Sequence, residues 1–154
     1  MNGQPIIPRE DTGRVYITDD KLYWEVENTN LLEISIPAIR AIGEYTTMHA
    51  RFRNEWFLVF VLDGGETSQI SAYAEGMNDV ISQLSAILSS ELRPGLALAT
   101  DFKSNVIWPP QLTGQELYEL KIKEAKTWFD RFRARLGFGD PVELVLKNSV
   151  KELL

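Results

Sequence analysis

The strongest constraint on this chain is a nearly continuous apolar segment, Glu55 to Leu62, that is followed directly by a turn signal. All but its first residue are apolar, so the segment predicts a central β-strand that is buried on both faces. The next four residues, 63–66, include two glycines that can adopt positive φ, which is typical of a tight hairpin. Residues 67–73 then predict the returning strand.

Shorter strands are predicted before this hairpin. Residues 14–26 alternate apolar and polar side chains around an Asp-Asp pair at 19–20, which tolerates a turn, so they predict a first hairpin. Residues 28–30 predict the next turn, and the alternation that follows it stops at Pro37. A further strand, residues 38–47, is expected to begin after a bend.

The apolar period changes from that of a strand to that of a helix after Gly76. An amphipathic helix is predicted from Asn78 to Leu92, and its apolar stripe consists of Val80, Leu84, Ile87 and Leu88. Pro94-Gly95 predicts its end. Residues 96–112 are expected to be irregular, with short strands at Leu96–Ala99 and near Val106–Trp108, and with a boundary at Pro109-Pro110.

A second helix is predicted over residues 114–136. Residues 113–116, Thr-Gly-Gln-Glu, match a capping box, in which the hydroxyl and the carboxylate each accept an otherwise unpaired backbone N–H. Its apolar seam has spacings of three and four residues: Tyr118, Ile122, Ala125, Phe129, Phe132 and Leu136. Gly137 is expected to end it. Residues 140–154 predict a last helix, and residues 142–146 also fit a strand.

The length of 154 residues suits one domain with a proper core. We expect an extended arm over residues 1–12, a strand-rich domain over 13–92, an irregular connector over 93–112 and a helical extension over 113–154. The helical extension is expected to pack on or beside the domain. These elements predict the α+β fold class.

Two segments resemble a known superfamily. Residues 13–24, GRVYITDDKLYW, look like the opening hairpin of GRAM and bacterial pleckstrin-homology-like domains, and residues 34–42, ISIPAIRAI, are similar to the isoleucine-proline segment that follows it. The resemblance covers residues 13–92 and implies a bent antiparallel sheet, a roll or barrel, capped by a helix. Members that bind phosphoinositides carry basic residues in the first hairpin loop. The Asp-Asp pair at 19–20 would repel a phosphate, so the resemblance implies protein interaction instead.

Composition excludes several kinds of chemistry. The chain has no cysteine, which excludes disulfides, thiolate catalysis and cysteine-bound metals. Residues 1–100 carry 14 acids and 7 bases, and this acidic balance disfavours nucleic-acid binding but suits a basic partner. We see no secretory signal and no apolar run that could span a bilayer, so we expect a cytoplasmic protein.

No catalytic motif or phosphate-binding glycine loop is present, so we expect no catalytic residue, no cofactor and no metal. His49 is the only histidine, and on a strand it would share one face with Arg51 and Arg53. These three side chains could bind a small anion or a carboxylate of a partner. Alternatively, they form a solvated face whose charges discourage pairing with another sheet edge.

Basic and aromatic side chains are interleaved in the predicted helix 114–136. Four of them are candidate partner-binding residues: Lys123, Lys126, Trp128 and Arg131. Such a face is found on helices that bind a partner's groove or a membrane surface, and also on a helix that packs against its own domain.

The sequence therefore predicts a non-enzymatic protein-interaction module of pleckstrin-homology-like fold. Two alternatives remain open. One is a peripheral membrane protein held by the basic helix 114–136. The other is a small acidic inhibitor, of the immunity-protein type, that masks a basic site on its partner.

Overall fold

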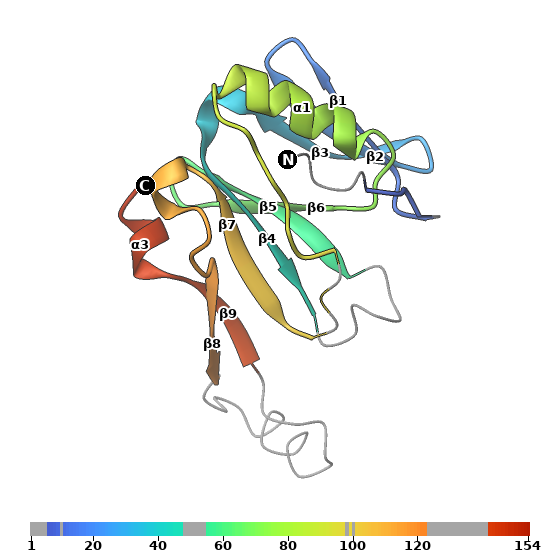
Figure 1. The fold of residues 1–154 in the computed structure, drawn as a ribbon. Helices are drawn as coiled ribbons and strands as arrows, with labels where there is room; N and C mark the ends of the chain where they lie inside the picture. The colour runs from blue at the N-terminus through green and yellow to red at the C-terminus, as the bar shows by residue number, and fades with distance from the viewer. Residues whose placement is uncertain (1–5, 10, 48–54, 98, 100, 123–141) are drawn as a thin grey trace, which may run out of the picture.

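The computed structural model describes residues 6–9, 11–47, 55–97, 99, 101–122 and 142–154. Their elements, in chain order, are β1 (Arg14–Thr18), β2 (Lys21–Val26), β3 (Thr29–Ser35), η1 (Ile36–Ala38), β4 (Ile39–Thr46), β5 (Trp56–Leu62), β6 (Thr67–Ser71), α1 (Met77–Ile87), β7 (Lys103–Trp108), η2 (Pro110–Leu112), β8 (Tyr118–Ile122), β9 (Val142–Leu146) and α3 (Asn148–Lys151) (Figure 1). The strands pair in the orders β1-β2-β3, β6-β5-β4-β7 and β8-β9.

All of these strand pairs are antiparallel, so the α+β class is as predicted. The expected single bent sheet is instead divided, because the chain leaves β3 through η1, with Pro37 in it, before β4 begins. Within the described residues the strands do not close into a barrel. No helix in this part of the chain has the length and apolarity needed to cross a membrane.

The three-stranded sheet forms where the sequence predicts two hairpins. Asp19, in the first turn, has a φ of 58°. The second turn consists of Glu27 and Asn28, with φ angles of 50° and 62°, and Thr29 already pairs with Val26. Positive φ at both residues of a two-residue turn matches the twist of the flanking strands. The second turn therefore lies one residue earlier than predicted.

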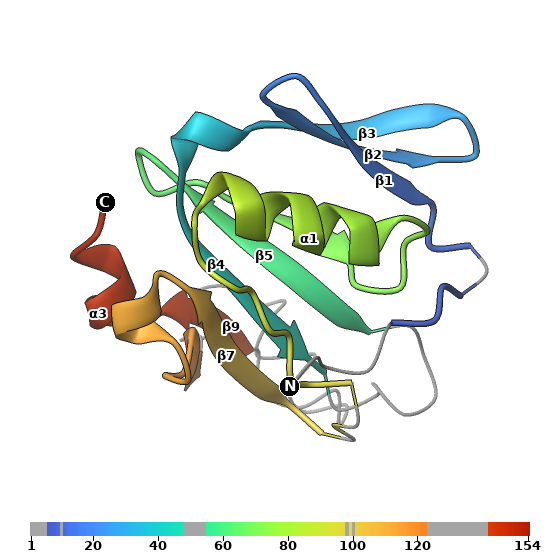
Figure 2. The ribbon, with the colours of Figure 1, turned by 45° about the horizontal axis from the view of Figure 1, so that its top comes forward.

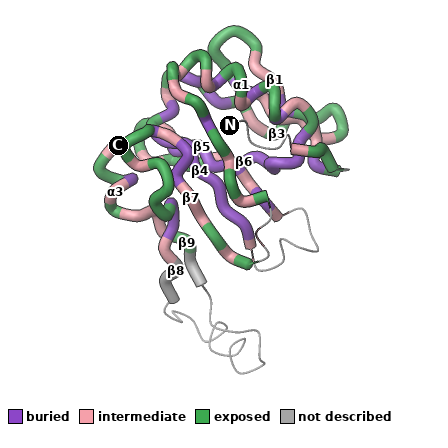
Figure 3. The backbone as a smooth tube through the Cα atoms, viewed as in Figure 1, coloured by how far each residue is buried: buried purple, intermediate pink, exposed green. Residues whose placement is uncertain are grey.

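Strand β5 lies inside the four-stranded sheet, between β6 and β4. Its side chains alternate between two cores: Trp56 and Phe60 are buried on one face, and Val59 and Val61 are buried on the other. Burial follows β4 and β5 through the middle of the molecule (Figure 3). The prediction of a central strand buried on both faces is confirmed.

Helix α1 packs against the face of this sheet that carries Trp56 and Phe60, next to the three-stranded sheet (Figure 2). Its Val80 and Leu84 are buried with Leu22 and Ile34 of the three-stranded sheet and Phe60 of β5 in one core, which we call the inner core. All five side chains are almost fully removed from water. The amphipathic stripe of α1 therefore joins the two sheets.

Helix α1 is shorter than predicted. It ends at Ile87, which is 52% exposed and so does not belong to the buried stripe. Ser89 takes a left-handed φ of 51°, and the Ser85 hydroxyl accepts the backbone N–H of Leu92 at 3.0 Å. Serine competes for backbone hydrogen bonds, which favours helix ends over helix interiors. The chain therefore leaves the helix before Pro94.

Strand β7 is longer than predicted and forms the edge next to β4. It pairs with β4 from Ile42, opposite Trp108, to Thr46, opposite Lys103. The described residues of Leu96–Ala99 form no strand, in contrast to the prediction.

The opposite face of the four-stranded sheet carries a second core, which we call the outer core. Its buried members are Ala41, Tyr45, Val59, Val61, Val106, Leu117, Tyr118 and Val150. Leu117 is fully buried and lies over Gly43, where a Cβ atom would come within 2.6 Å of the Leu117 Cδ2 atom. The missing side chain at Gly43 makes room for Leu117, so residues beyond 112 complete this side of the fold.

The predicted helix 114–136 is wrong in its described part, because residues 118–122 form β8. Tyr118 and Ile122 are four residues apart, a spacing that fits one face of a helix and also one face of a strand. The capping box does not form either. The Thr113 hydroxyl donates to the carbonyl of Ile107 at 3.0 Å, and Gly114 has a φ of 89°.

The strand alternative for residues 142–146 is confirmed, since they form β9 opposite β8. The last helix, predicted over residues 140–154, is reduced to the single turn of α3, residues 148–151, among the described positions. Residues 123–141 lie outside the described part of the chain.

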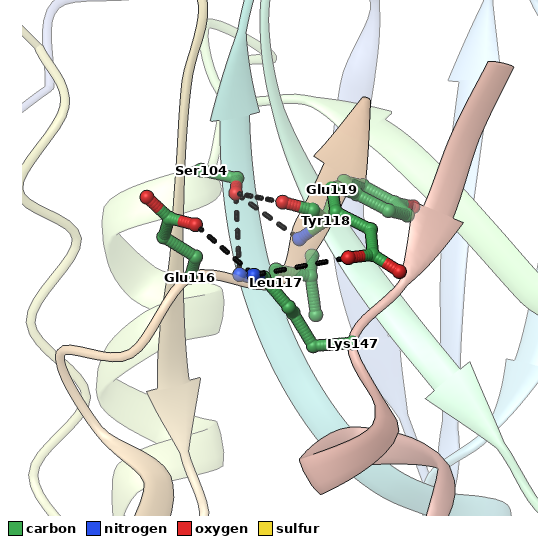
Figure 4. A network of polar contacts seen from close by, with 6 residues as sticks. All are labelled: Ser104, Glu116, Leu117, Tyr118, Glu119 and Lys147. Carbon is green, nitrogen blue, oxygen red and sulfur yellow. Dashed lines mark hydrogen bonds and ion pairs between the residues drawn. The ribbon is translucent and has the colours of Figure 1, made fainter. Parts of the chain in front are cut away.

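A polar network holds the start of β8 on β7 (Figure 4). The Ser104 hydroxyl oxygen accepts the backbone N–H of Leu117 at 3.2 Å and that of Tyr118 at 3.1 Å. Lys147 directly follows β9, and its ammonium group lies 3.5 Å from the Glu116 carboxylate and 3.9 Å from the Glu119 carboxylate. These contacts keep Leu117 over the sheet.

We expect Gly43 and Leu117 to be coupled in stability. Leu117→Ala leaves a cavity in a closed core and should lower the free energy of unfolding by about 2–5 kcal/mol. Gly43→Ala overfills the same space and should cost about 1–3 kcal/mol. In the double variant the alanine methyl occupies the space that Leu117 leaves, so the combined loss should be smaller than the sum of the two losses.

Urea denaturation of the four proteins, monitored by tryptophan fluorescence, measures this coupling. Gly43→Ala combined with Leu84→Ala is the control, because Leu84 belongs to the inner core and its loss should add to that of Gly43→Ala. Additive losses for Gly43 and Leu117 would contradict the packing described here.

Candidate functional site

A cleft of about 650 Å³ lies where the N-terminal arm meets the β2–β3 turn and Glu75, two residues before α1. We call it the arm cleft. Its charged lining residues are Arg9, Asp11, Arg14, Glu25, Glu27 and Glu75. The volume falls within the range of ligand-binding pockets, about 300–1,000 Å³.

The floor of the arm cleft is set by the close approach of two backbone segments. The Glu75 N–H donates to the carbonyl of Gly13, and the Val15 N–H donates to the carbonyl of Glu75, both at 2.8 Å. Gly13 has a φ of 80°, and a Cβ atom there would collide with the carbonyl oxygen of Glu25. Only glycine fits this position, so the sequence fixes how the arm enters β1.

Four carboxylates and two guanidinium groups line the arm cleft, which is a formal excess of two negative charges. Glu25 already has two partners in the protein, because it accepts hydrogen bonds from the Tyr16 hydroxyl at 2.7 Å and from Arg14 at 3.0 Å. These two contacts, that with Tyr16 first, lower the pKa of Glu25. Glu27 and Glu75 are both exposed, so their charges face an incoming partner.

The outer face of the three-stranded sheet continues this surface. Tyr16 and Tyr23 stack there with ring centroids 5.3 Å apart, and the Arg14 guanidinium lies 5.2 Å from the Tyr16 ring centroid. Next to them, Lys21 pairs with Glu33 at 2.6 Å. Half-buried tyrosines offer a rigid surface that is both apolar and able to form hydrogen bonds, which is why tyrosine is enriched at protein interfaces.

The N-terminal arm forms the other wall. The Ile6 backbone pairs with the Asn78 side-chain amide in both directions, at 2.9 and 2.7 Å. The Arg9 N–H donates to the Tyr73 carbonyl at 3.2 Å, and the Arg9 guanidinium lies 3.8 Å from the Tyr73 ring centroid. Thr12 is buried and donates its hydroxyl proton to the same carbonyl at 2.9 Å.

A second cleft, of about 590 Å³, lies beside β7 and is lined by Lys103, Ser104, Asn105, Glu116, Tyr118 and Glu119, among others. Most of these groups already belong to the network of Figure 4. Burial, together with the neighbouring Tyr45, raises the pKa of Tyr118 to about 12, so its hydroxyl stays protonated at neutral pH. Most polar groups of this second cleft therefore serve to hold β8 in place.

Glu44 lies behind this second cleft and is fully buried. Its carboxylate accepts the Gly95 backbone N–H at 2.7 Å, the Trp56 indole N–H at 3.4 Å and the Asn105 side-chain amide at 3.5 Å. These three donors are neutral. Burial raises the pKa of Glu44, and the hydrogen bonds oppose that shift only in part.

None of the seven residues proposed from the sequence falls in the described part of the chain: His49, Arg51, Arg53, Lys123, Lys126, Trp128 and Arg131. The structure therefore neither brings them together nor separates them. Within the residues that are described, no group of three or more His, Asp or Glu side chains is placed to hold a metal ion.

The residues of the arm cleft and the Tyr16–Tyr23 pair were missed by sequence reasoning. Asp11, Glu27 and Glu75 come from the arm, a hairpin turn and the approach to a helix, so no motif spacing links them. The available signal was the acidic balance of the first 100 residues. It indicated a basic partner without indicating where such a partner would bind.

We expect Glu44 to make stability depend on pH in an unusual direction. Its raised pKa means that the folded state binds the proton more tightly than the unfolded chain, whose value is near the ordinary 4.5. The stability of the wild type relative to Glu44→Gln should therefore increase as pH falls through the folded-state pKa of Glu44 toward 4.5. Urea denaturation between pH 8 and pH 5 measures the difference.

Glu25→Gln is the control, because the pKa of Glu25 is shifted in the opposite direction. Because the pKa of Glu25 is lowered, its contribution is lost only as pH falls below the unfolded-state pKa of about 4.5 toward the folded-state value, so the difference between wild type and Glu25→Gln should stay constant between pH 8 and pH 5. A difference between wild type and Glu44→Gln that stays constant over this pH range would contradict the burial of a titrating carboxyl at position 44.

No family model matches this chain, and neither a curated protein nor a solved structure matches it.

Proposed function

We propose that the chain is a non-enzymatic protein-interaction module of pleckstrin-homology-like fold, and that it binds its partner at the arm cleft and the adjoining tyrosine face. The order of elements supports the family assignment, since the three-stranded sheet and the strands β4, β5 and β6 are followed by a helix that packs against both sheets. The Asp19-Asp20 turn continues to disfavour a phosphoinositide ligand at the first hairpin.

The observation that carries this proposal is the continuity of the arm cleft with the tyrosine face. Arg14 and Glu25 line the cleft and also contact Tyr16, so the two surfaces share residues. A surface that combines stacked tyrosines with a negatively charged cleft suits a partner segment carrying both basic and apolar side chains. The excess of negative charge selects a basic partner and speeds its approach.

The same charge favours one second candidate, the small acidic inhibitor. Glu27 and Glu75 are exposed at the rim of the cleft and would lie against basic residues of a partner's active site. An inhibitor abolishes the turnover of the enzyme it binds, whereas an adaptor leaves turnover unchanged. The membrane alternative is not carried forward, because it required a helix over residues 114–136 and residues 118–122 are a strand.

A random peptide library displayed on phage and panned against the full chain tests the proposal. We expect the selected peptides to carry a net positive charge and to bind at least tenfold more weakly to Glu27→Lys/Glu75→Lys than to the wild type. Their affinity should also fall as salt is raised, since the attraction is between exposed charges.

The matched control is Glu66→Lys/Glu152→Lys, which makes the same charge change at two exposed glutamates outside the arm cleft. Its affinity for the selected peptides should remain within about twofold of the wild type after the shared change in net charge is allowed for. Selection of peptides without positive charge, or equal losses in both double variants, would overturn the proposal.

A further inference from the structure

The arm itself is bound to the domain in the way a separate peptide would be. A side-chain amide, that of Asn78, recognises the N–H and the carbonyl of Ile6 at once. Ile6 is half-buried against the inner core, whereas the next residue, Ile7, is 79% exposed. Ile6 therefore anchors the arm through both its side chain and its backbone, while residues 7–9 are exposed.

The surface that receives the arm belongs to other parts of the chain. Tyr73 is held by Trp56, whose ring meets it edge-on with centroids 5.4 Å apart, and its backbone N–H is accepted by the Ser71 hydroxyl. Asn78 belongs to the first turn of α1. Tyr73 is therefore held by contacts that do not involve residues 6–9, and Asn78 is carried by α1.

The arm has a fixed end and a weakly held end. At the fixed end, the carbonyl of Thr12 accepts the Trp24 indole N–H at 2.9 Å, and Gly13 pairs with Glu75. The contacts of residues 6–9 include hydrogen bonds that are exposed to water, such as those of Ile6 with Asn78, and the Arg9 guanidinium over Tyr73, whereas Thr12 at the fixed end is buried. Releasing residues 6–9 from the domain would therefore cost less free energy than releasing residues 12 and 13.

We infer that the surface formed by Tyr73 and Asn78 is a peptide-binding site, and that residues 6–9 occupy it as an intramolecular competitor. Its ligand is a partner segment with an aliphatic residue followed three positions later by arginine, as Ile6 and Arg9 are in this chain. This inference rests on the proposed function and adds to it the partner's chemistry and a means of regulation. The basic residue agrees with the acidic character of the adjoining arm cleft.

Competition by the arm is a matter of effective concentration. The effective concentration of a tethered segment at its own binding surface is about millimolar, so a free peptide must outcompete it to bind. Weakening the arm without altering that surface should therefore strengthen the binding of a free peptide. The same change made in the free peptide should abolish its binding.

The experiment uses a fluorescein-labelled peptide with the sequence of residues 4–12, QPIIPREDT, and full-length protein, with anisotropy as the readout. We expect the peptide to bind Ile6→Ser/Arg9→Ala at least tenfold more tightly than the wild type. Adding Asn78→Ala to that variant should remove the gain. Ile7→Ser is the matched control, since this exposed neighbour should leave the wild-type affinity unchanged.

Several results would overturn the inference. These are no binding to the arm-weakened variant, equal binding to all variants, or a dimer of the wild type in light scattering that is lost in Ile6→Ser/Arg9→Ala, since the occupant would then be a second copy of the chain. Failure here combined with library peptides that still depend on Glu27 and Glu75 would leave the proposed function standing.

Hydrogen exchange of the unmodified chain gives a second test that needs no variant. The Arg9 amide donates to Tyr73 within the weakly held part, and the Val15 amide donates to Glu75 within the fixed part. We expect the Arg9 amide to exchange at least tenfold faster than the Val15 amide, because the arm opens locally while β1 stays in place. Equal protection of the two amides would show that the arm is not a releasable segment.

Discussion

The fold depends on one hydrophobic constraint, namely that β5 carries apolar side chains on both of its faces. Each face of such a strand is stable only if it is kept from water. Helix α1 and the three-stranded sheet cover the face of Phe60, and Leu117 and Val150 cover the face of Val59. The chain before residue 93 can supply only the first of these covers. Residues beyond 112 are therefore needed to complete the fold, and the bare backbone of Gly43 allows them to approach closely.

Sequence reasoning succeeded where the signals are local. The β5–β6 hairpin and the β1–β2 hairpin follow from alternation and from turn residues that are neighbours in the chain. It failed for residues 118–122, where a spacing of four residues satisfies both a helix and a strand, and where tertiary contacts decide. Ser104 and Lys147, which hold that segment in its extended form, lie 14 and 29 residues from Tyr118, and no helix-capping pattern could reveal them.

The candidate site was harder to predict than the fold, because its residues converge only in space. The acidic balance of the first 100 residues suggested a basic partner, and the arm cleft gives that suggestion a location. Charge runs in the sequence directed attention to Arg51 and Lys126 instead, and both lie outside the described residues. The position of the arm could not be predicted from periodicity, because Asn78 binds the backbone of Ile6 and backbone groups are the same in nearly every residue type.

The outer core has a consequence for the order of events during synthesis. Ala41 and Val59 leave the ribosome long before Leu117 and Val150, the residues that shield them. Until those late residues emerge, the nascent chain can form the β4–β5 ladder, but one apolar face of that ladder is exposed to solvent. Exposed sheet surface of that kind attracts chaperones and other unfinished chains. Truncated chains that lack the residues beyond 112 would therefore aggregate, in addition to being less stable.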